Sequence, residues 1–210
     1  KLVNRNFFSW TTSLNLSVPK NKLVSFPDLE GSTYANQYVI GQPLNIQKVY
    51  HYIGLDRETG IYQFEDYNGD GQITSANDRE KVIVTDPKFF GGVQNNISYK
   101  NWRLDFLLQF VKQIGRNQND LGVLPGTLGN LPVTLINAWE QPGDNSTIQP
   151  YTTGINSEVV NSYYNYSMSD AVFSDASFIR LKNLSISYLI SIKSYNCKIY
   201  MQGQNLLTLT

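Results

Sequence analysis

Several features that would point to common protein classes are scarce or missing in this chain. A single cysteine, Cys197, stands among 210 residues, which excludes an intrachain disulfide framework. Charged residues make up only 16% of the chain, and 17 basic residues balance 17 acidic ones, so nothing indicates a nucleic-acid partner. No apolar run reaches the roughly 18 residues of a membrane-spanning helix, which leaves a transmembrane β-barrel open because barrel strands alternate.

Histidine is almost absent, which weakens most hydrolytic mechanisms. His51 is the only histidine, so a catalytic zinc site or a Ser-His-Asp triad is poorly supported, and we expect a packed or hydrogen-bonded residue in an aromatic strand. Glycosidase chemistry needs two carboxylates across a cleft, and the nominal pairs are better explained as loop polarity. These pairs are Glu65 with Asp66 and Asp170 with Asp175. We therefore predict that the protein is not an enzyme.

Aromatic and uncharged polar side chains, by contrast, are abundant, with 14 tyrosines and 10 phenylalanines. In residues 8–18 the apolar side chains share one parity and Ser, Thr and Asn share the other, which predicts a two-faced strand. A turn at 19–22 follows, and we expect the segment 23–29 to return as the partner strand. The pattern between 23 and 88 leaves the number of strands open.

A hairpin is predicted over residues 88–111, with a short turn around Lys100-Asn101. Each arm has about ten residues, which is the length that crosses a bilayer at a tilt. One face of the second arm is apolar throughout. The other face carries Arg103 and Asp105, which would be costly against lipid but suit a wet lumen.

A second hairpin is predicted near the end of the chain, with its turn near 191–196. Leu184, Ile186, Tyr188 and Ile190 share one parity, opposite Asn183, Ser185, Ser187 and Leu189, and alternation resumes in 198–209. In a regular strand, the apolar residues Ile179 and Leu181 would point to the opposite face from Leu184. A β-bulge near Lys182-Asn183 would restore them to one face, because a bulge inserts one extra residue.

The segment 112–177 between the hairpins is rich in Gly, Pro, Asn, Ser and Tyr and has no sustained period. We expect a long functional loop region, since structureless stretches of this length are rare in compact domains. Exposed aromatic rings in such loops stack on sugars or grip peptides, although loop self-packing or an interfacial aromatic girdle are alternatives. The predicted ligand contacts are Trp139, Tyr163, Tyr164 and Tyr166.

The segment 66–72 begins like an EF-hand-type calcium loop, in which Gly71 allows oxygen ligands to converge. The loop should close with an acidic residue where Asn77 stands, so we expect Asp78 to take that role one residue late. A metal-free, Asx-rich turn is the alternative. The predicted ligands of a structural Ca²⁺ are Asp66, Asn68, Asp70, Gln72 through its backbone carbonyl, and Asp78.

Short motifs also follow one another along the chain in a definite order. They are GQPL at 41–44, DYNGDG at 66–71, DPKFFGG at 86–92, PGD at 142–144, DASFIRLKNL at 175–184 and GQNLLT at 203–208. This succession resembles the C-terminal third of the SusC/RagA family of TonB-dependent transporters. It spans nearly the whole chain, and it is therefore more specific than the calcium-type loop alone.

The resemblance implies an all-β fold, the C-terminal part of a large antiparallel transmembrane β-barrel that has 22 strands in the intact family. Residues 1–210 would form part of the barrel domain, with 112–177 as a long extracellular loop region. The N-terminal plug and the final strands would lie outside this chain. The outer face of the strands would meet outer-membrane lipid.

The resemblance also implies a function and partners. These are import of a nutrient, a glycan or an oligopeptide, across a Gram-negative outer membrane of the Bacteroidetes type. A SusD-like surface lipoprotein would assist, and TonB would supply energy through the absent N-terminal region.

Two other classes of protein are alternatives, and the first of them also predicts the alternation. A secreted soluble β-sandwich that binds carbohydrate, with a structural calcium loop, would bury the apolar face of 102–110 instead of turning it to lipid. A glycoside hydrolase domain needs a convincing carboxylate pair, which the sequence does not offer.

Overall fold

The computed structural model describes residues 3–5, 7–119 and 122–210, so residues 120–121 of the predicted loop region lie outside the described residues. The chain divides into two compact units, and each is described by itself. The first unit comprises Lys1–Lys20, Pro87–Gln113 and Asp175–Thr210, and the second comprises Asn21–Asp86 and Ile114–Ser174. The helices of the described residues are all too short or too polar to cross a membrane.

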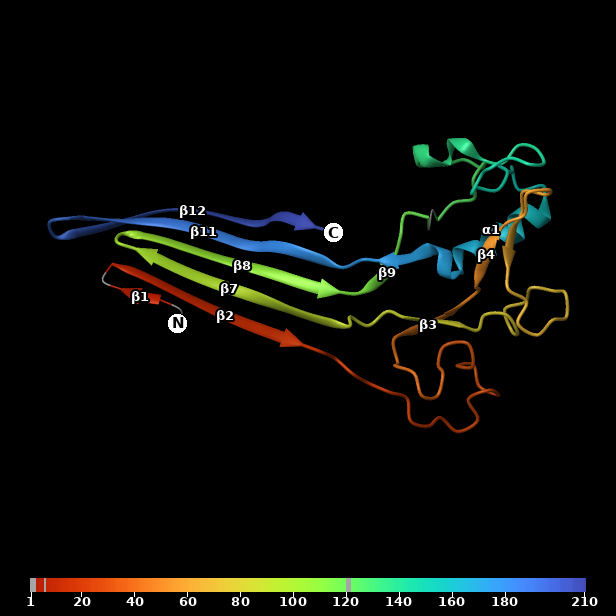
Figure 1. Ribbon diagram of the computed structural model, residues 1–210, viewed down its shortest axis with the longest axis horizontal. Helices are drawn as coiled ribbons and strands as arrows, with labels where there is room; N and C mark the ends of the chain where they lie inside the picture. Colours follow the sequence, from red (N-terminus) through yellow and green to blue (C-terminus); the bar gives the residue numbers. More distant parts are fainter. Residues whose placement is uncertain (1–2, 6, 120–121) are drawn as a thin grey trace. The chain divides into compact units, whose positions relative to one another are not determined.

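The first unit is one antiparallel sheet of six strands in the order β1-β2-β7-β8-β11-β12, and its long strands run side by side in Figure 1. The strands are β1 (Val3–Arg5), β2 (Phe8–Ser17), β7 (Phe89–Tyr99), β8 (Trp102–Lys112), β11 (Phe178–Ile192) and β12 (Tyr195–Leu209). The predicted all-β class with antiparallel strands is confirmed.

Both predicted hairpins are confirmed. β7 turns into β8 through Lys100, whose φ of 50° lies in the left-handed region, and β11 turns into β12 through Lys193, with a φ of 49°. The pairing of β11 shifts register between Leu181 and Asn183, where the parity of the sequence predicted a bulge.

The predicted partner of the strand at 8–18 is wrong. β2 pairs with β1 on one side and with β7 on the other, and the segment 23–29 forms no strand. The backbone N–H of Leu23 instead donates to the carbonyl of Gln42 at 2.8 Å. The physical reason is that β2 completes its backbone hydrogen bonds with a strand far along the chain.

The register of the sheet sorts its side chains into two faces. Directly paired residues of antiparallel strands point to the same face. One row across five strands is wholly apolar: Trp10, Ile97, Leu104, Ile186 and Met201. The adjacent row, on the opposite face, is wholly polar: Thr11, Asn96, Asp105, Ser185 and Gln202.

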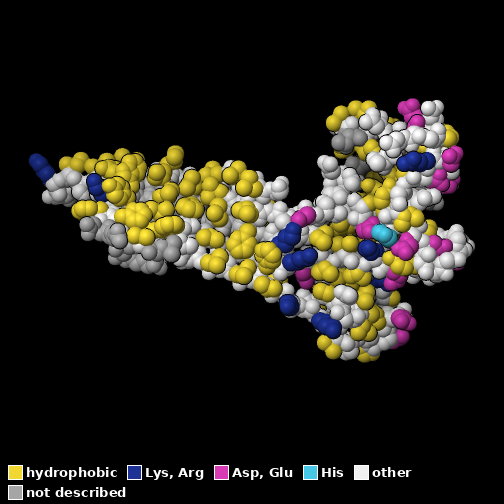
Figure 2. Space-filling view, viewed as in Figure 1, with side chains coloured by type: hydrophobic (Ala, Val, Ile, Leu, Met, Phe, Trp, Pro, Cys, Tyr) yellow, Lys and Arg dark blue, Asp and Glu magenta, His cyan; other side chains and the backbone are white. Residues whose placement is uncertain are grey.

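The apolar face is open in the first unit. Met201 is 71% exposed and Leu14 is 68% exposed, and Figure 2 shows hydrophobic side chains gathered over the long strands. At the end of the sheet where β7 turns into β8, the same face carries an aromatic row. Its members are Phe8, Tyr99, Trp102 and Tyr188, and the rings of the last two lie 4.7 Å apart.

The second unit is built from short elements. Its paired strands are β3 (Ile46–Val49) with β6 (Lys81–Val84), β4 (Tyr52–Leu55) with β5 (Tyr62–Phe64), and β9 (Ile114–Arg116) with β10 (Phe173–Asp175), which ends in the first unit. Its helical segments are η1 (Val133–Asn137), α1 (Ser157–Ser167) and η2 (Asp170–Val172). Buried Tyr50, Tyr62 and Phe64 form the centre of its core.

The helix α1 corrects the expectation that 112–177 is without regular structure. The side chain of Asn156 caps the helix by accepting hydrogen bonds from the N–H groups of Glu158 and Val159. The carboxylate of Glu158 in the first turn adds a favourable interaction with the helix dipole. Val159 and Tyr163 are buried on one side of the helix, so tertiary packing stabilises a helix that has little sequence period.

Candidate functional site

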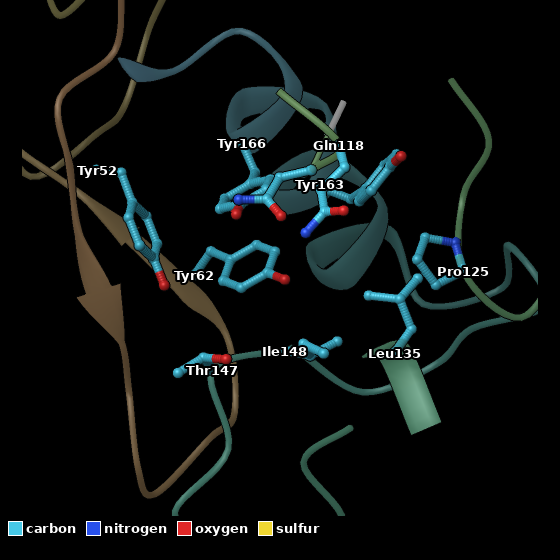
Figure 3. A pocket seen from close by; sticks show the side chains of 10 residues that line it. Tyr52, Tyr62, Gln118, Pro125, Leu135, Thr147, Ile148, Tyr163 and Tyr166 are labelled. Carbon is cyan, nitrogen blue, oxygen red and sulfur yellow. The ribbon is translucent and has the colours of Figure 1, made fainter. Parts of the chain in front are cut away.

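The second unit contains a cavity of about 290 Å³ that is rich in tyrosine. β4 and β5 contribute Tyr52 and Tyr62, and α1 contributes Tyr163 and Tyr166, which lie three residues apart on one side of the helix. Figure 3 shows Tyr52, Tyr62 and Tyr166 on one side of the cavity. The cavity therefore joins a hairpin to a helix about a hundred residues further along the chain.

Three of these rings pack on one another. The rings of Tyr62 and Tyr166 stack with centroids 4.3 Å apart and planes 21° apart. Tyr52 meets Tyr166 edge-on at 5.2 Å and Tyr62 edge-on at 5.6 Å. Such pairs stabilise beyond their area alone, by about 0.5–1.5 kcal/mol each. The cluster thus forms a stiff side of the cavity.

The remaining lining comes from loops and from η1. Pro125, Leu135 and Ile148 supply apolar surface, and Pro125 and Leu135 lie across the cavity from the tyrosine cluster in Figure 3. Gln118, Asn119 and Thr147 add amide and hydroxyl groups. Among the described residues that line the cavity, none carries a charged side chain. Polar and apolar groups thus share the lining, and a concave site with convergent polar groups is a usual form of small-ligand site.

The hydroxyl groups of the tyrosines differ in their partners. The Tyr163 hydroxyl donates to the carbonyl of Val123 at 2.6 Å, and the Tyr62 hydroxyl accepts from the backbone N–H of Gln149. In the described part of the chain, the hydroxyls of Tyr52 and Tyr166 have no hydrogen-bond partner. These two groups are free to bind a ligand.

Burial keeps the tyrosines protonated. Desolvation raises the pKa of Tyr52 to about 12, with a smaller contribution from Tyr166. Desolvation also raises the pKa of Tyr62 and that of Tyr166. The described residues that line the cavity are therefore uncharged at physiological pH.

The structure brings together two of the four aromatic residues predicted to contact a ligand. Tyr163 and Tyr166 line the cavity, whereas Tyr164 is 54% exposed and does not line it. Trp139 packs so closely on Gly60 that a Cβ there would lie 2.3 Å from its ring, and its indole N–H donates to the carbonyl of Arg57 at 3.2 Å. Ligand contact by these residues stays a prediction.

Sequence reasoning missed Tyr52, Tyr62 and Gln118. The first two lie in short strands where aromatic residues are ordinary, and Gln118 lies in a loop without a motif. The two-residue period of the strand indicates that Tyr62 and Phe64 lie on one face. It does not indicate which helix packs against that face.

The calcium-type loop is organised by its own side chains. The carboxylate of Asp66 accepts hydrogen bonds from the N–H groups of Gly69 and Gly71, each at 2.7 Å. Asp70 accepts from the N–H of Gln72 at 2.7 Å and from the amide of Asn68 at 2.7 Å. These are Asx-type turns, which tolerate the left-handed conformation of the glycines.

Asp78 returns to the same loop, as its late position required. Its buried carboxylate accepts from the N–H of Tyr67 at 2.9 Å and from the N–H of Thr74 at 2.7 Å. The hydrogen bond from Thr74, followed by the one from Tyr67, lowers the pKa of Asp78. Within the described residues, no three His, Cys, Asp or Glu side chains converge on a metal position, and the Ca²⁺ site stays a prediction.

His51 is a hydrogen-bonded structural residue, as predicted. Its Nδ1 lies 2.6 Å from a carboxylate oxygen of Asp170, whose other oxygen accepts from the N–H of Tyr52 at 2.9 Å. Asp175 pairs instead with Lys112 at 2.5 Å. Each carboxylate of this nominal pair thus has a partner of its own.

The first unit has the long strands, short turns and single apolar face that are typical of a segment of an outer-membrane β-barrel. No family model matches the chain. It is 28% identical over 237 residues to TonB-dependent receptor P3 of Formosa agariphila, covering 97% of this chain and 22% of the relative. The relative is a receptor and not an enzyme, in agreement with the prediction.

Solved structures of the RagAB peptide transporter share the fold. The chain aligns over its full length with a TM-score of 0.73 and 19% identity, and it covers 24% of that chain. The RagAB peptide importer in its open-open state gives a TM-score of 0.72 at 16% identity. The chain therefore spans about a quarter of these relatives. The resemblance to TonB-dependent transporters indicated by the order of motifs is confirmed.

Proposed function

We propose that this chain forms part of the wall and the outer loops of a TonB-dependent transporter that imports a nutrient across a Gram-negative outer membrane. The observation that carries the proposal is the two-faced sheet. Its apolar face is exposed over strands of 10 to 15 residues, long enough to cross a bilayer at a tilt. In water such a patch would promote aggregation, whereas lipid would cover it.

The exceptions on the apolar face support a lipid environment. Thr12 and Asn95 are directly paired on this face. The side-chain oxygen of Asn95 accepts from the Thr12 hydroxyl at 2.7 Å and from the Trp10 indole N–H at 3.0 Å. An unsatisfied polar group in hydrocarbon costs several kcal/mol, so mutual pairing is what a lipid-facing position requires.

The opposite face suits an aqueous lumen. Arg103 and Asp105 project from β8 on this side, between uncharged polar residues of the neighbouring strands. The sheet of the first unit is a single layer in its described strands. A soluble sandwich would need a second sheet over the apolar face, so the barrel is the better explanation.

In the intact protein the sheet would belong to a closed barrel of 22 strands. The region 112–177 would form extracellular loops that grip the cargo. A SusD-like lipoprotein would cooperate at the surface, and TonB would act through an N-terminal region. The cargo would be a glycan or an oligopeptide, and the membrane would be of the Bacteroidetes type.

The test is membrane fractionation of the full-length native protein, followed by electrophoresis with and without heating. We expect recovery in the outer-membrane fraction and a band whose mobility changes on heating, as a stable β-barrel gives. Recovery as a soluble protein without detergent would contradict the proposal and favour the carbohydrate-binding sandwich.

We also propose that the loop 66–78 binds a structural Ca²⁺. Added Ca²⁺ should slow proteolysis of this loop in the full-length protein. A free Ca²⁺ concentration of five times the Kd would stabilise the folded loop by about 1 kcal/mol. Asp70→Asn, which removes one charge, should weaken the effect. If Ca²⁺ and a chelator give the same cleavage rate, the loop is a metal-free Asx turn.

A further inference from the structure

We infer that a basic cavity at the turn end of the first unit's sheet binds a phosphate group. This inference goes beyond the proposed import function and does not depend on the cargo. It is carried by the uneven distribution of charge along the chain, by a cavity that three cationic side chains line, and by a buried hydroxyl in that cavity without a partner.

The neutral chain divides into two units of opposite charge. The sequence of the first unit holds eleven Lys and Arg residues but only two acidic residues, Asp105 and Asp175. The second unit has the reverse balance, with six basic and fifteen acidic residues. An excess of one sign of charge costs self-repulsion and attracts ions of the opposite sign. An anionic ligand would therefore stabilise the first unit.

Three of these cations line a cavity of about 170 Å³ where two hairpins of the sheet meet. Lys100 and Arg103 come from the β7–β8 hairpin, and Lys198 comes from β12. β11 and β12 continue past the β7–β8 turn (Figure 1). The backbone N–H of Leu189 donates to the carbonyl of Asn101 at 3.0 Å, which holds the turn against β11 and fixes the shape of the cavity.

The three cations have no counter-charge among the described residues. Arg103 and Lys198 make no side-chain hydrogen bond or ion pair within the described part of the chain. Lys100 only lies over the ring of Tyr99, with its ammonium 5.5 Å from the ring centroid. Their positive charges are thus available to an anion from outside the sheet.

The two acidic residues of the unit are engaged elsewhere. Asp175 pairs with Lys112, and Asp105 lines a separate hollow further along the polar face. Residues 1–27 and 176–210 contain no acidic residue in the sequence. The strands on both sides of the β7–β8 hairpin therefore have no carboxylate to offer to the cavity.

A buried hydroxyl distinguishes this cavity from a patch of solvated surface charge. Ser187 on β11 lines the cavity and is only 6% exposed, and its hydroxyl has no hydrogen-bond partner among the described residues. Arg103 is directly paired with Ser187 on one side and with Ser98 on the other, so the guanidinium and both hydroxyls share one face. Because a buried polar group without a partner is unfavourable, a ligand that accepts from Ser187 would remove that cost.

This set of donors suits a phosphate group better than a carboxylate. A phosphate group carries a charge of roughly −1.5 to −2 at neutral pH and three strong acceptor oxygens. Arg103 can bind two of these oxygens at once, and the lysines add compact charges. Ser98 and Ser187 add hydroxyl donors. A carboxylate, with one charge and two oxygens, would leave several of these groups without a partner.

Two sources can supply the group, free phosphate in solution and the headgroup of an anionic lipid. The rings of Trp102 and Tyr188 lie at the same end of the sheet on its apolar face. Aromatic residues of this kind gather at the level of the lipid headgroups, and short turns lie on the periplasmic side of outer-membrane barrels. Free phosphate would reach the cavity from the polar face, and a headgroup would reach it around the end of the sheet.

The experiment measures binding by calorimetry with the purified full-length protein in a phosphate-free detergent solution. The probes are inorganic phosphate, acetate, and phosphatidic acid dispersed in the same detergent, with phosphatidylcholine as its reference. We expect inorganic phosphate or phosphatidic acid to bind, and binding of phosphatidic acid alone identifies the headgroup as the source. Arg103→Gln and Lys198→Gln should each weaken binding about tenfold, since each removes a charged hydrogen bond, and Ser187→Ala about threefold.

The matched control is Lys193→Gln. It removes the same charge from the same hairpin, at the turn between β11 and β12, but Lys193 does not line the cavity. It should leave the affinity unchanged. The side chains of Arg103 and Lys198 are exposed, so the charge variants should retain the heat-dependent mobility of the parent protein.

Four results would overturn the inference. The first is that neither inorganic phosphate nor phosphatidic acid binds, and the second is that acetate binds as tightly as either. The third is binding that no cavity variant weakens. The fourth is equal weakening by Lys193→Gln and Lys198→Gln, which would show diffuse attraction to the charge of the unit. Membrane fractionation does not depend on any of these results, so that assay judges the import function separately.

Discussion

The sheet of the first unit and the loop-rich second unit are stabilised in different ways. In the sheet, a side chain's environment follows largely from its parity, because rows such as Trp10 to Met201 and Thr11 to Gln202 keep one polarity from strand to strand. In the second unit, the environment follows from contacts between distant segments, such as Tyr62 with Tyr166. The first arrangement tolerates many sequences of the right pattern, whereas the second depends on particular residues.

The largest loss of stability is expected in the second unit, where a glycine packs against a side chain so closely that no Cβ fits. Gly60 and Gly69 have φ of 73° and 71°, so alanine is strained at both. A Cβ at Gly60 would also strike Trp139, while at Gly69 nothing lies within 4 Å. We expect Gly69→Ala to cost about 1–2 kcal/mol and Gly60→Ala about 2–5 kcal/mol because overpacking adds to strain.

Hydrogen exchange of the amides in 56–61 and 66–72 of the full-length protein measures both glycine variants. Equal losses of protection at the two sites would show that the Trp139 contact contributes nothing. Packing in the second unit would then depend less on particular residues.

In the sheet, the same substitution should have opposite consequences at adjacent residues. Met201 lies in the apolar row and Gln202 in the polar row. Arginine against lipid near the bilayer midplane costs about 2–4 kcal/mol, so Met201→Arg should be strongly destabilising and Gln202→Arg nearly neutral. Urea unfolding of the full-length protein in lipid vesicles provides the comparison, and similar midpoints would refute the assignment of faces.

A smaller loss is expected at the polar pair on the apolar face. Asn95→Ala would leave the Trp10 and Thr12 donors without their acceptor, at about 1–3 kcal/mol. Asn96→Ala on the polar face is the control and should cost little. If both variants unfold at the same urea concentration, Asn95 is solvated, and the face is not in lipid.

The mildest effect appears only at high pH and only in the second unit. A tyrosine whose folded pKa is raised contributes stability that is complete below its unfolded pKa near 10. That contribution is lost as pH rises through the folded value, about 12 for Tyr52. Hydrogen exchange of α1 should therefore accelerate between these values, and Tyr52→Phe should reduce the acceleration; an identical pH profile would contradict it.

Much of the sheet could be predicted because alternation is a local property. The turns expected around Lys100-Asn101 and near 191–196, and the bulge near Lys182-Asn183, follow from where the alternation stops or shifts. The partner of β2 could not be predicted, because its ladder is completed by β7, which lies beyond the whole segment 18–88. Local sequence states which face a strand presents but not which strand lies beside it.

The tyrosine-rich cavity was predictable only in part. The density of tyrosines in 163–166 indicates ligand contact, but Tyr52 and Tyr62 gain their role from the helix that packs on them. The helix itself had a signal, Asn156 followed by Glu158 at its start. Its β-branched and aromatic residues gave no clear helical period, so that signal stood alone.

The bulge in β11 has a consequence for how this sheet tolerates changes in length. Along a regular strand, losing one residue turns every later side chain to the wrong face. Between Leu181 and Asn183, however, β11 already carries one residue more than β8 opposite it. Loss of Lys182 would make that ladder regular and keep Leu181 and Leu184 on the same face. The bulge is thus a position in β11 where a single codon can be lost without inverting the strand.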